Sequence, residues 1–224
     1  MSDIDLDSQR RELTRRMLDH VAFDGWSWAA LYAAAEDLDL DKVDAANAFP
    51  EGPDGAIAVF STEADDAMLV ALEDHDLDSM RTRERIHTAI RVRLEQNEQH
   101  QEAIRSALAV LAMPGNTALG TRLLYRTVDA VWNAAGDASI DINFYSKRAL
   151  LAGVYSATLL YWLEDTSDGH EKTWAFLEQR LDDVVRIGGE FGKRVKQVTE
   201  IPRRIGRMLP DFPRRQREFA DMAR

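Results

Sequence analysis

Breaks in helical periodicity are few and widely spaced along this chain of 224 residues. The 12 glycines and 6 prolines gather between long stretches whose apolar residues recur at helical spacing. No stretch alternates apolar and polar residues for long enough to predict a β-strand. The sequence therefore predicts an all-α protein, with helix lengths set by the positions of these breaks.

Short helices come first in this pattern and longer ones follow. Ser27 is a suitable N-cap for the second helix. The predicted helices cover residues 8–24, 28–35, 40–49, 55–73, 79–97, 98–112, 117–135, 144–164 and 170–199. This layout resembles that of TetR-type regulators, in which a three-helix head is joined to a larger ligand-binding and dimerising body. We expect a head at 1–50, a helical body at 51–199 and a tail at 200–224.

The charge of the segment from Trp26 to Met80 argues against DNA binding. It contains fourteen acidic residues and one basic residue, Lys42. Contacts between basic side chains and phosphates supply most of the affinity of proteins for DNA. The remaining basic residues near the head lie on the first predicted helix, at Arg10, Arg11, Arg15 and Arg16. We therefore expect no nucleic-acid partner and interpret the head as a retained packing unit; a TetR-type transcriptional regulator with an apolar ligand is the alternative.

The sequence gives no positive sign of catalysis. A helical di-iron site needs two Glu-x-x-His pairs, and only the pair Glu84 and His87 fits, among several arginines that would oppose a cation. A Ser-His-Asp triad is not excluded by composition, but the nucleophile-elbow motif, the phosphate-binding glycine loop and the dinucleotide fingerprint are absent. We predict a protein that is not an enzyme, with no catalytic residue, cofactor or metal.

Three features favour a cytoplasmic location. The chain has no cysteine, which suits a reducing compartment. The polar and acidic N-terminal residues carry no apolar segment of a secretory signal. The longest uncharged apolar run, from Ala149 to Leu163, is shorter than a membrane span.

That apolar run is predicted to be buried on more than one side. One side would face a dimer partner, and another would face the interior of the body. The interior is expected to hold a long apolar ligand, and its lining would include Leu123, Trp132, Leu151 and Tyr155. An ordinary solid core is the alternative interpretation.

The C-terminal region has the opposite charge to the rest of the chain. Nine basic and two acidic residues lie between Lys193 and Arg217. Apolar and basic residues there follow the spacing of an amphipathic helix, which is typical of a reversible membrane-surface anchor. The residues expected to contact the membrane are Ile201, Ile205, Met208, Leu209, Arg203, Arg204 and Arg207. A solvated terminus is the alternative.

Two blocks resemble a known family. The stretches Asp141–Ser167 and Glu171–Leu181 closely resemble the ubiquinone-biosynthesis family of lipid-binding proteins called coenzyme Q nine. The arginine-rich stretch Met80–Leu94 is also similar to it. The resemblance extends roughly from Gln9 to Arg194.

The resemblance implies a TetR-like fold that has lost DNA binding, forms a homodimer and encloses a lipid between its later helices. It implies an accessory protein, peripheral to the inner membrane, that extracts a polyprenyl quinone intermediate and presents it to the demethoxyubiquinone hydroxylase. The expected ligand is an isoprenoid quinone intermediate or a phospholipid. The residues expected to contact it are Leu119, Leu123, Val128, Trp132, Tyr145, Leu151, Val154, Tyr155 and Thr158.

The resemblance also implies a hydroxylase-docking surface that includes Glu171, Trp174 and Phe176. Trp174 and Phe176 are two residues apart, so they cannot share one helix face. One of them is expected to point outward and the other into the core. An exposed Trp174 would suit a protein interface, because aromatic residues dominate binding hot spots, whereas without the resemblance a core position is favoured.

Overall fold

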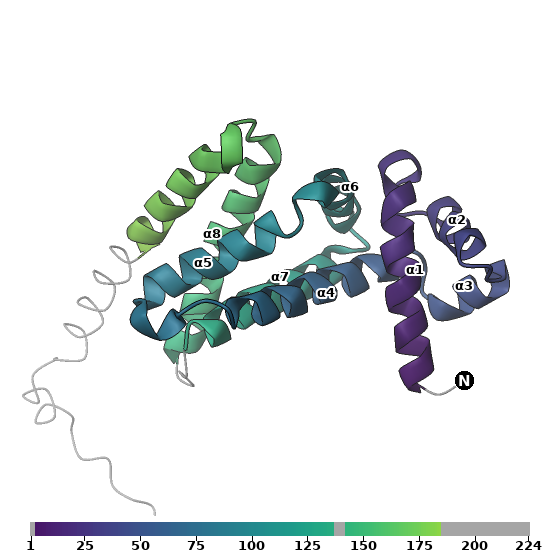
Figure 1. Ribbon diagram of the computed structural model, residues 1–224, viewed down its shortest axis with the longest axis horizontal. Coiled ribbons are helices and arrows are strands. Elements are labelled where there is room, and N and C mark those ends of the chain that lie inside the picture. Colours follow the sequence, from purple (N-terminus) through teal and green to yellow (C-terminus); the bar gives the residue numbers. More distant parts are fainter. Residues whose placement is uncertain (1–2, 137–141, 185–224) are drawn as a thin grey trace, which may run out of the picture. The chain divides into compact units, whose positions relative to one another are not determined.

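The computed structural model describes residues 3–136 and 142–184, and in these ranges every regular element is helical. The α-helices, labelled in Figure 1, are α1 (Asp3–Asp24), α2 (Trp28–Asp37), α3 (Lys42–Ala48), α4 (Gly55–Leu72), α5 (Thr82–Glu95), α6 (Gln101–Leu111), α7 (Thr117–Ala134) and α8 (Ile142–Glu164). Residues 171–184 are also helical. Short 3-10 turns are η1 (Leu77–Ser79), η2 (Glu98–His100) and η3 (Asp168–His170). The predicted all-α fold is confirmed.

The three N-terminal helices pack closely because their facing residues are small. Five alanines of α2 and α3 are fully buried in one cluster with the leucine, methionine and valine side chains of α1; they are Ala30, Ala34, Ala35, Ala45 and Ala48. The side chain of Ser27 accepts a hydrogen bond from the backbone N–H of Ala30, which confirms the predicted N-cap of α2. The indole N–H of buried Trp26 donates to the backbone oxygen of Ala103 at 2.9 Å, and so connects these helices to α6.

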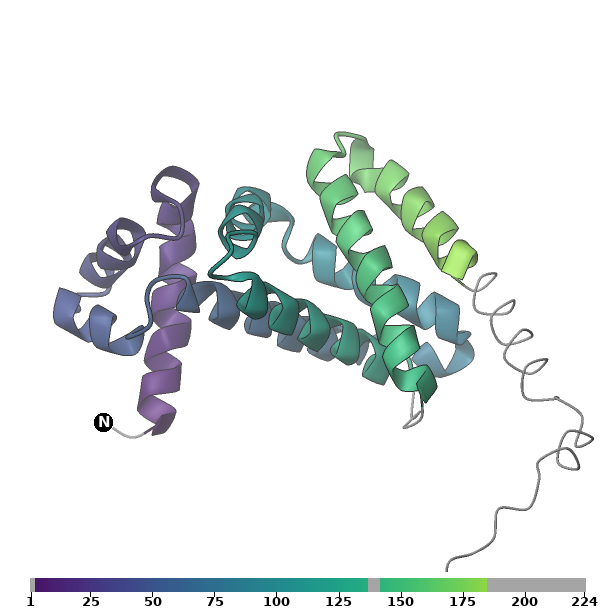
Figure 2. The same ribbon diagram turned by 180° about the vertical axis from the view of Figure 1, so that it is seen from behind.

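The later helices share a second core. It contains Met68 of α4, Ile90 and Leu94 of α5, Val131 of α7 and Trp162 of α8, all almost fully buried. Figures 1 and 2 show α4 and α7 side by side, with α6 and α8 set apart from each other. Residues up to Val184 form one compact unit. The division into a head and a body at residue 50 stays a prediction.

Several predicted helices are shorter in the structure. The charged helix predicted at 79–97 is preceded by η1 and begins at Thr82. The backbone N–H of Arg81 donates to the carboxylate of Glu84 at 2.8 Å, and this contact fixes the new start. The helix predicted at 98–112 likewise begins with η2, so α6 starts at Gln101. The predicted helix at 170–199 is seen through residue 184, and its remainder lies outside the described residues.

The turn between α8 and the helix at 171–184 is organised by the carboxylate of Asp165. One oxygen accepts hydrogen bonds from the backbone N–H and the hydroxyl of Ser167, at 2.9 and 2.6 Å. The other accepts the same two groups of Thr173, at 2.8 and 2.7 Å. Burial raises the pKa of Asp165, but these hydrogen bonds outweigh it and hold the pKa well below its ordinary value.

We expect Asp165→Asn to lower the free energy of unfolding at pH 7, because an amide cannot accept all four hydrogen bonds. Since the pKa of Asp165 is lowered in the folded state, its stabilisation is complete above the ordinary aspartate pKa of about 3.9. The stabilisation is lost as the pH falls from there through the folded-state pKa. Urea unfolding at several pH values should show the difference between variant and parent shrinking below about pH 4. Asp168→Asn in the same turn, at an exposed side chain, is the control; an equal loss from both variants would contradict the assignment.

Candidate functional site

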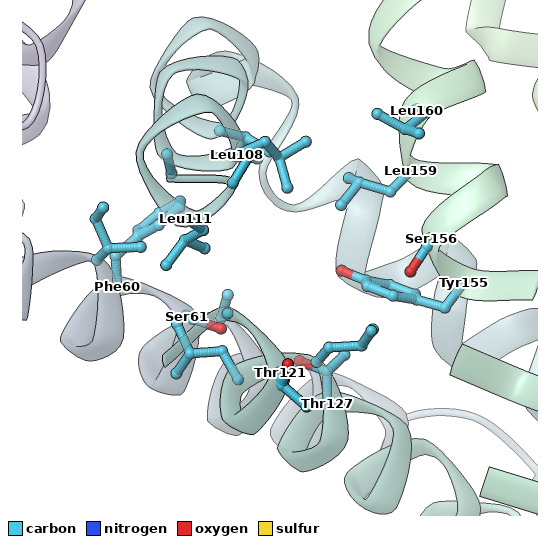
Figure 3. A pocket seen from close by; sticks show the side chains of 18 of the residues that line it. Phe60, Ser61, Leu108, Leu111, Thr121, Thr127, Tyr155, Ser156, Leu159 and Leu160 are labelled. Atoms are coloured by element: carbon cyan, nitrogen blue, oxygen red, sulfur yellow. The ribbon is translucent and has the colours of Figure 1, made fainter. Parts of the chain in front are cut away.

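A cavity of about 510 Å³ lies between α4, α5, α6, α7 and α8 (Figure 3). This volume is within the range of small-molecule binding sites. Most of the lining is apolar and consists of Ile57, Phe60, Ala64, Ile104, Ala107, Leu108, Leu111, Leu123, Leu124, Leu159 and Leu160. We call this cavity the pocket. Its composition suits the chain of a lipid or another elongated apolar molecule.

Helical spacing explains how the walls of the pocket are built. Ile104, Ala107, Leu108 and Leu111 follow i, i+3, i+4, i+7 spacing, so α6 presents one apolar face to the pocket. Where α6 and α7 meet, a Cβ atom at Gly120 would lie 3.3 Å from the Cβ of Leu111. Glycine at this position therefore permits the close approach of the two helices.

The opening of the pocket can be located from its solvent-exposed lining residues. These are Ala112, Thr117, Thr121 and Leu160, which come from the end of α6, from α7 and from α8. In Figure 3, α6 and α8 stand on opposite sides of the pocket and α7 runs beneath it. The opening therefore lies between α6 and α8.

Arg105 of α6 bridges the same two helices. Its guanidinium contacts the carboxylate of Glu164 and donates to the backbone oxygen of Leu163 at 2.6 Å, both at the end of α8. The side chains of Arg105 and Glu164 are 43% and 74% exposed, so this bridge lies at the surface. We call it the Arg105 bridge.

A buried polar network forms another part of the pocket wall. At its centre is Arg93 of α5, which is 7% exposed. Its Nε donates to Asp65 of α4 at 2.7 Å, and one terminal nitrogen donates to the hydroxyl of Tyr155 of α8 at 2.6 Å. The other terminal nitrogen lies 3.4 Å from the hydroxyl of Thr127 of α7 and 3.5 Å from that of Ser61. One guanidinium thus joins four helices at the edge of an apolar cavity.

The charges in this network compensate one another. Burial lowers the pKa of Arg93, but its interactions with Tyr155 and Asp65 outweigh burial and raise that pKa above its ordinary value. Burial raises the pKa of Tyr155, although the guanidinium acts in the opposite direction. At neutral pH the network therefore contains a protonated guanidinium and a neutral phenol. The carboxylate of Asp65, 1% exposed, balances the positive charge.

The predicted lipid-contacting residues are divided between the pocket and the core. Leu123 and Tyr155 line the pocket. Outside the lining, Leu119 is half-buried against the N-terminal core, Trp132 is half-buried against the later core, and Val128, Leu151, Val154 and Thr158 are buried. The side chain of Tyr145 and the predicted membrane-contacting residues 201–209 lie outside the described residues. Direct contact of any of the nine with a lipid stays a prediction.

Sequence reasoning missed the contribution of α6 and the polar network. The apolar spacing of α6 is visible in the sequence and could have indicated a wall. Arg93, by contrast, lies in a helix with arginines at 83, 85 and 91, where a solvated side chain is the usual expectation. Only its position opposite Asp65 shows that it is buried.

The structure decides between the two positions considered for Trp174. This residue is 7% exposed, and its indole N–H donates to the backbone oxygen of Gly169 at 2.8 Å. The guanidinium of Arg91 lies 5.1 Å from the centre of its ring. Trp174 is therefore a core residue, and its interpretation as an exposed anchor is corrected.

The other two residues of the predicted docking surface are more accessible. Glu171 is exposed, and Phe176 is half-buried. The ring of Phe176 stacks on that of Tyr161, with 4.7 Å between centroids. Docking through Glu171, Trp174 and Phe176 stays a prediction.

The arginines of α1 are engaged with the protein itself. Arg15 lies 2.6 Å and Arg11 3.9 Å from the carboxylate of Glu63. Arg10 donates to the backbone oxygen of Ala48 at 2.7 Å, and Arg16 pairs with Asp19. These contacts reduce the charge available to a phosphate backbone. They add a structural argument to the prediction of no nucleic-acid partner, which stays a prediction.

Comparison with known proteins relates this geometry to a family. Residues 117–188, which include α7 and α8, match the COQ9 family. The chain is 33% identical over 190 residues to ubiquinone biosynthesis protein COQ9-B, mitochondrial, of Xenopus laevis, an alignment covering 82% of this chain and 64% of that protein. It is 32% identical over 199 residues to the Homo sapiens protein COQ9, mitochondrial, covering 86% and 62%. The chain is therefore similar to the COQ9 family.

The chain spans less than two thirds of the length of these COQ9 relatives. Its fold is also similar to that of a TetR transcriptional regulator from Nitrosomonas europaea ATCC 19718, with a TM-score of 0.64. That likeness covers 78% of this chain and 97% of the regulator at 23% identity, so it shows the fold alone. The predicted TetR-like fold is confirmed.

Two negative findings apply to the residues that the structure describes. None of their helices is both long and apolar enough to cross a membrane. Within the same ranges, no group of three or more histidine, aspartate or glutamate side chains is arranged to hold a metal ion.

Removing one partner of the buried ion pair should be costly. We expect Arg93→Met to lower the free energy of unfolding by roughly 3–5 kcal/mol, because it leaves the carboxylate of Asp65 buried without its main partner. Replacing both residues, as Arg93→Met with Asp65→Leu, should recover much of the loss. Urea denaturation measures both effects. Arg126→Met is the control, because that 46% exposed guanidinium should contribute about 1 kcal/mol or less to the free energy of unfolding. If Arg93→Met lowered the free energy of unfolding by no more than Arg126→Met, this account would be contradicted.

The burial of Trp174 gives a second prediction. We expect Trp174→Ala to reduce the free energy of unfolding by roughly 3–5 kcal/mol, as is typical when a buried aromatic side chain is truncated. Phe176→Ala should have a smaller effect, since that ring is only half-buried. Thermal unfolding of the two variants separates them. A Trp174→Ala protein that melts with the parent would show that the ring is not part of the core.

Proposed function

We propose that this protein is a non-catalytic, lipid-binding accessory factor of ubiquinone biosynthesis. The observation that carries the proposal is the pocket of about 510 Å³ with a mainly apolar lining. Its relatives are named as ubiquinone biosynthesis proteins, which supports a role in that pathway. The ligand we propose is a polyprenyl quinone intermediate, whose apolar chain matches the leucines of α6, α7 and α8.

The physical reason for binding is the removal of apolar surface from water. Each Å² of apolar surface that is buried contributes about 25 cal/mol, so even part of a polyprenyl chain in the pocket contributes several kcal/mol. A chain longer than the pocket would extend through the opening between α6 and α8. The protein would then shield part of the lipid and leave the rest accessible, which suits a carrier that presents its ligand to an enzyme.

The partner that receives the lipid is proposed to be the demethoxyubiquinone hydroxylase. Its docking surface would be centred on the accessible side chains of Glu171 and Phe176. Tyr161, which stacks on Phe176 and is 39% exposed, extends this surface onto α8. Trp174 lies on the same helix as Glu171 and Phe176, at 171–184. Its buried ring would support the docking surface from the core side.

Membrane contact and self-association belong to the same proposal. The basic, amphipathic sequence after Ile201 supports a reversible contact with an anionic membrane surface, peripheral to the inner membrane. For the homodimer, α8 supplies exposed apolar side chains at Leu150 and Leu160, which are 37% and 59% exposed. A second copy packed there would remove them from water.

The test of lipid binding is a pocket-filling variant. Ser156 lines the pocket from α8, so Ser156→Trp should occupy the cavity and abolish lipid co-purification. Organic extraction of the purified protein, followed by mass spectrometry, should give lipid from the parent and almost none from the variant. The control is Ala157→Trp, at a residue that is also half-buried but outside the lining. Lipid-free parent protein in repeated preparations, or equal lipid in both variants, would count against the proposal.

A further inference from the structure

The two sides of the pocket opening are joined by few polar contacts. In Figure 3, α6 and α8 stand on opposite sides of the pocket, with the opening between them. The guanidinium of Arg105 contacts the carboxylate of Glu164 and donates to the backbone oxygen of Leu163. In the described part of the chain, no other hydrogen bond or ion pair joins α6 to α8. The Arg105 bridge is therefore the polar connection across the opening.

The bridge lies close to the residues that form the opening. On α8, Glu164 is one helical turn after Leu160, which lines the pocket and is 59% exposed. On α6, Arg105 is three residues before Leu108, another lining residue. Residues at these spacings are neighbours on one side of a helix. The side chains of the bridge therefore cross from α6 to α8 beside the opening, and neither of them lines the pocket itself.

The guanidinium of Arg105 also has a partner on its own helix. Its Nε lies 3.5 Å from the carboxylate of Glu102, one turn earlier on α6. Glu102 and Glu164 are 71% and 74% exposed, so one positive charge is shared between two similarly hydrated carboxylates. When the contact with Glu164 breaks, Arg105 keeps Glu102 and water as partners. Exposed ion pairs are weak, so the bridge can open and close at ordinary temperature.

We infer that the Arg105 bridge is a latch across the opening of the pocket, which slows both the entry and the release of an apolar ligand that the pocket encloses and leaves its dissociation constant unchanged. This inference rests on the proposed function, because it concerns the passage of a ligand into the same pocket. It holds for any apolar molecule that fits the pocket, since the bridge lies outside the lining.

The position of the bridge explains why rates and affinity separate. Arg105 and Glu164 are not lining residues, so a bound ligand gains no contact from them. The bridge is formed in the empty protein, and it can form again behind a ligand that is no longer than the pocket. It has to break only while the ligand passes, so it adds equally to the barriers for entry and release. Equal changes in both barriers leave the equilibrium constant unchanged.

The experiment uses the full chain and N-phenyl-1-naphthylamine, an uncharged apolar dye that fluoresces more strongly in apolar surroundings. Stopped-flow mixing gives its association rate constant, and dilution of the loaded protein gives its dissociation rate constant. Arg105→Met keeps an apolar side chain and removes the guanidinium. We expect it to raise both rate constants by about threefold to tenfold, as loss of a charged surface contact predicts. Glu164→Gln should raise them less, because the hydrogen bond to the backbone oxygen of Leu163 remains.

Arg16→Met is the matched control. The side chains of Arg16 and Arg105 are both 43% exposed, but Arg16 is paired with Asp19 on its own helix, α1. It does not line the pocket. Its replacement should therefore change neither rate constant of the dye.

A covalent link across the opening gives the opposite prediction. The chain contains no cysteine, so Arg105→Cys combined with Glu164→Cys provides the only thiols that a short bis-maleimide can join. The cross-linked protein should take up and release the dye at least about tenfold more slowly than the same variant before cross-linking, because a covalent link does not open thermally. Before cross-linking, the double variant should exchange the dye faster than the parent.

The outcomes separate the latch from the proposed function. Unchanged rate constants in Arg105→Met, or a change in only one of them, would overturn the latch and leave the binding of apolar molecules intact. Dye exchange that cross-linking does not slow would also overturn it. A parent protein that does not bind the dye would overturn both proposals. Faster exchange in Arg105→Met and slower exchange after cross-linking, with an unchanged dissociation constant, would support the inference.

Discussion

The contact between Arg93 and Asp65 determines how the later helices of this protein meet. A buried guanidinium must have its nitrogens satisfied by partners, because leaving them unpaired costs several kcal/mol. Those partners come from α4, α7 and α8, and the residue itself comes from α5. The four helices are therefore held in one relative arrangement. The apolar pocket lies beside this contact, and Arg93 forms part of its wall.

Apolar periodicity was sufficient to predict the helices. A helix buries one face, so apolar residues recur in the sequence at helical spacing. Ser27 could be identified as an N-cap because its hydroxyl acts on its own helix. Long-range pairing could not be foreseen in the same way. Nothing in the local sequence distinguishes Arg93 from the exposed arginine at 91, since burial depends on Asp65, 28 positions earlier.

The prediction of the pocket lining was limited in the same way, because the local sequence does not show which residues meet across the fold. Leu123 and Tyr155 were predicted to face an interior cavity and do line the pocket. Leu151 and Val154 belong to α8, as Tyr155 does, and they are apolar too. They nevertheless lie in the packed core. An apolar side chain fits either environment, so the sequence cannot separate a cavity wall from a core. Trp174 shows the reverse case, in which a family resemblance suggested a surface position for a buried ring.

The two ionic contacts near the pocket differ in their exposure to solvent. The pair of Arg93 and Asp65 is shielded from salt, whereas the Arg105 bridge between α6 and α8 lies at the surface and is screened by dissolved ions. The contact that joins α6 to the end of α8 therefore weakens as ionic strength rises, whereas the contact in the pocket wall does not. On the proposed function, a ligand in the pocket would therefore lie near two ionic contacts that respond differently to dissolved ions. A change in ionic strength would alter the surface contact without altering the buried one.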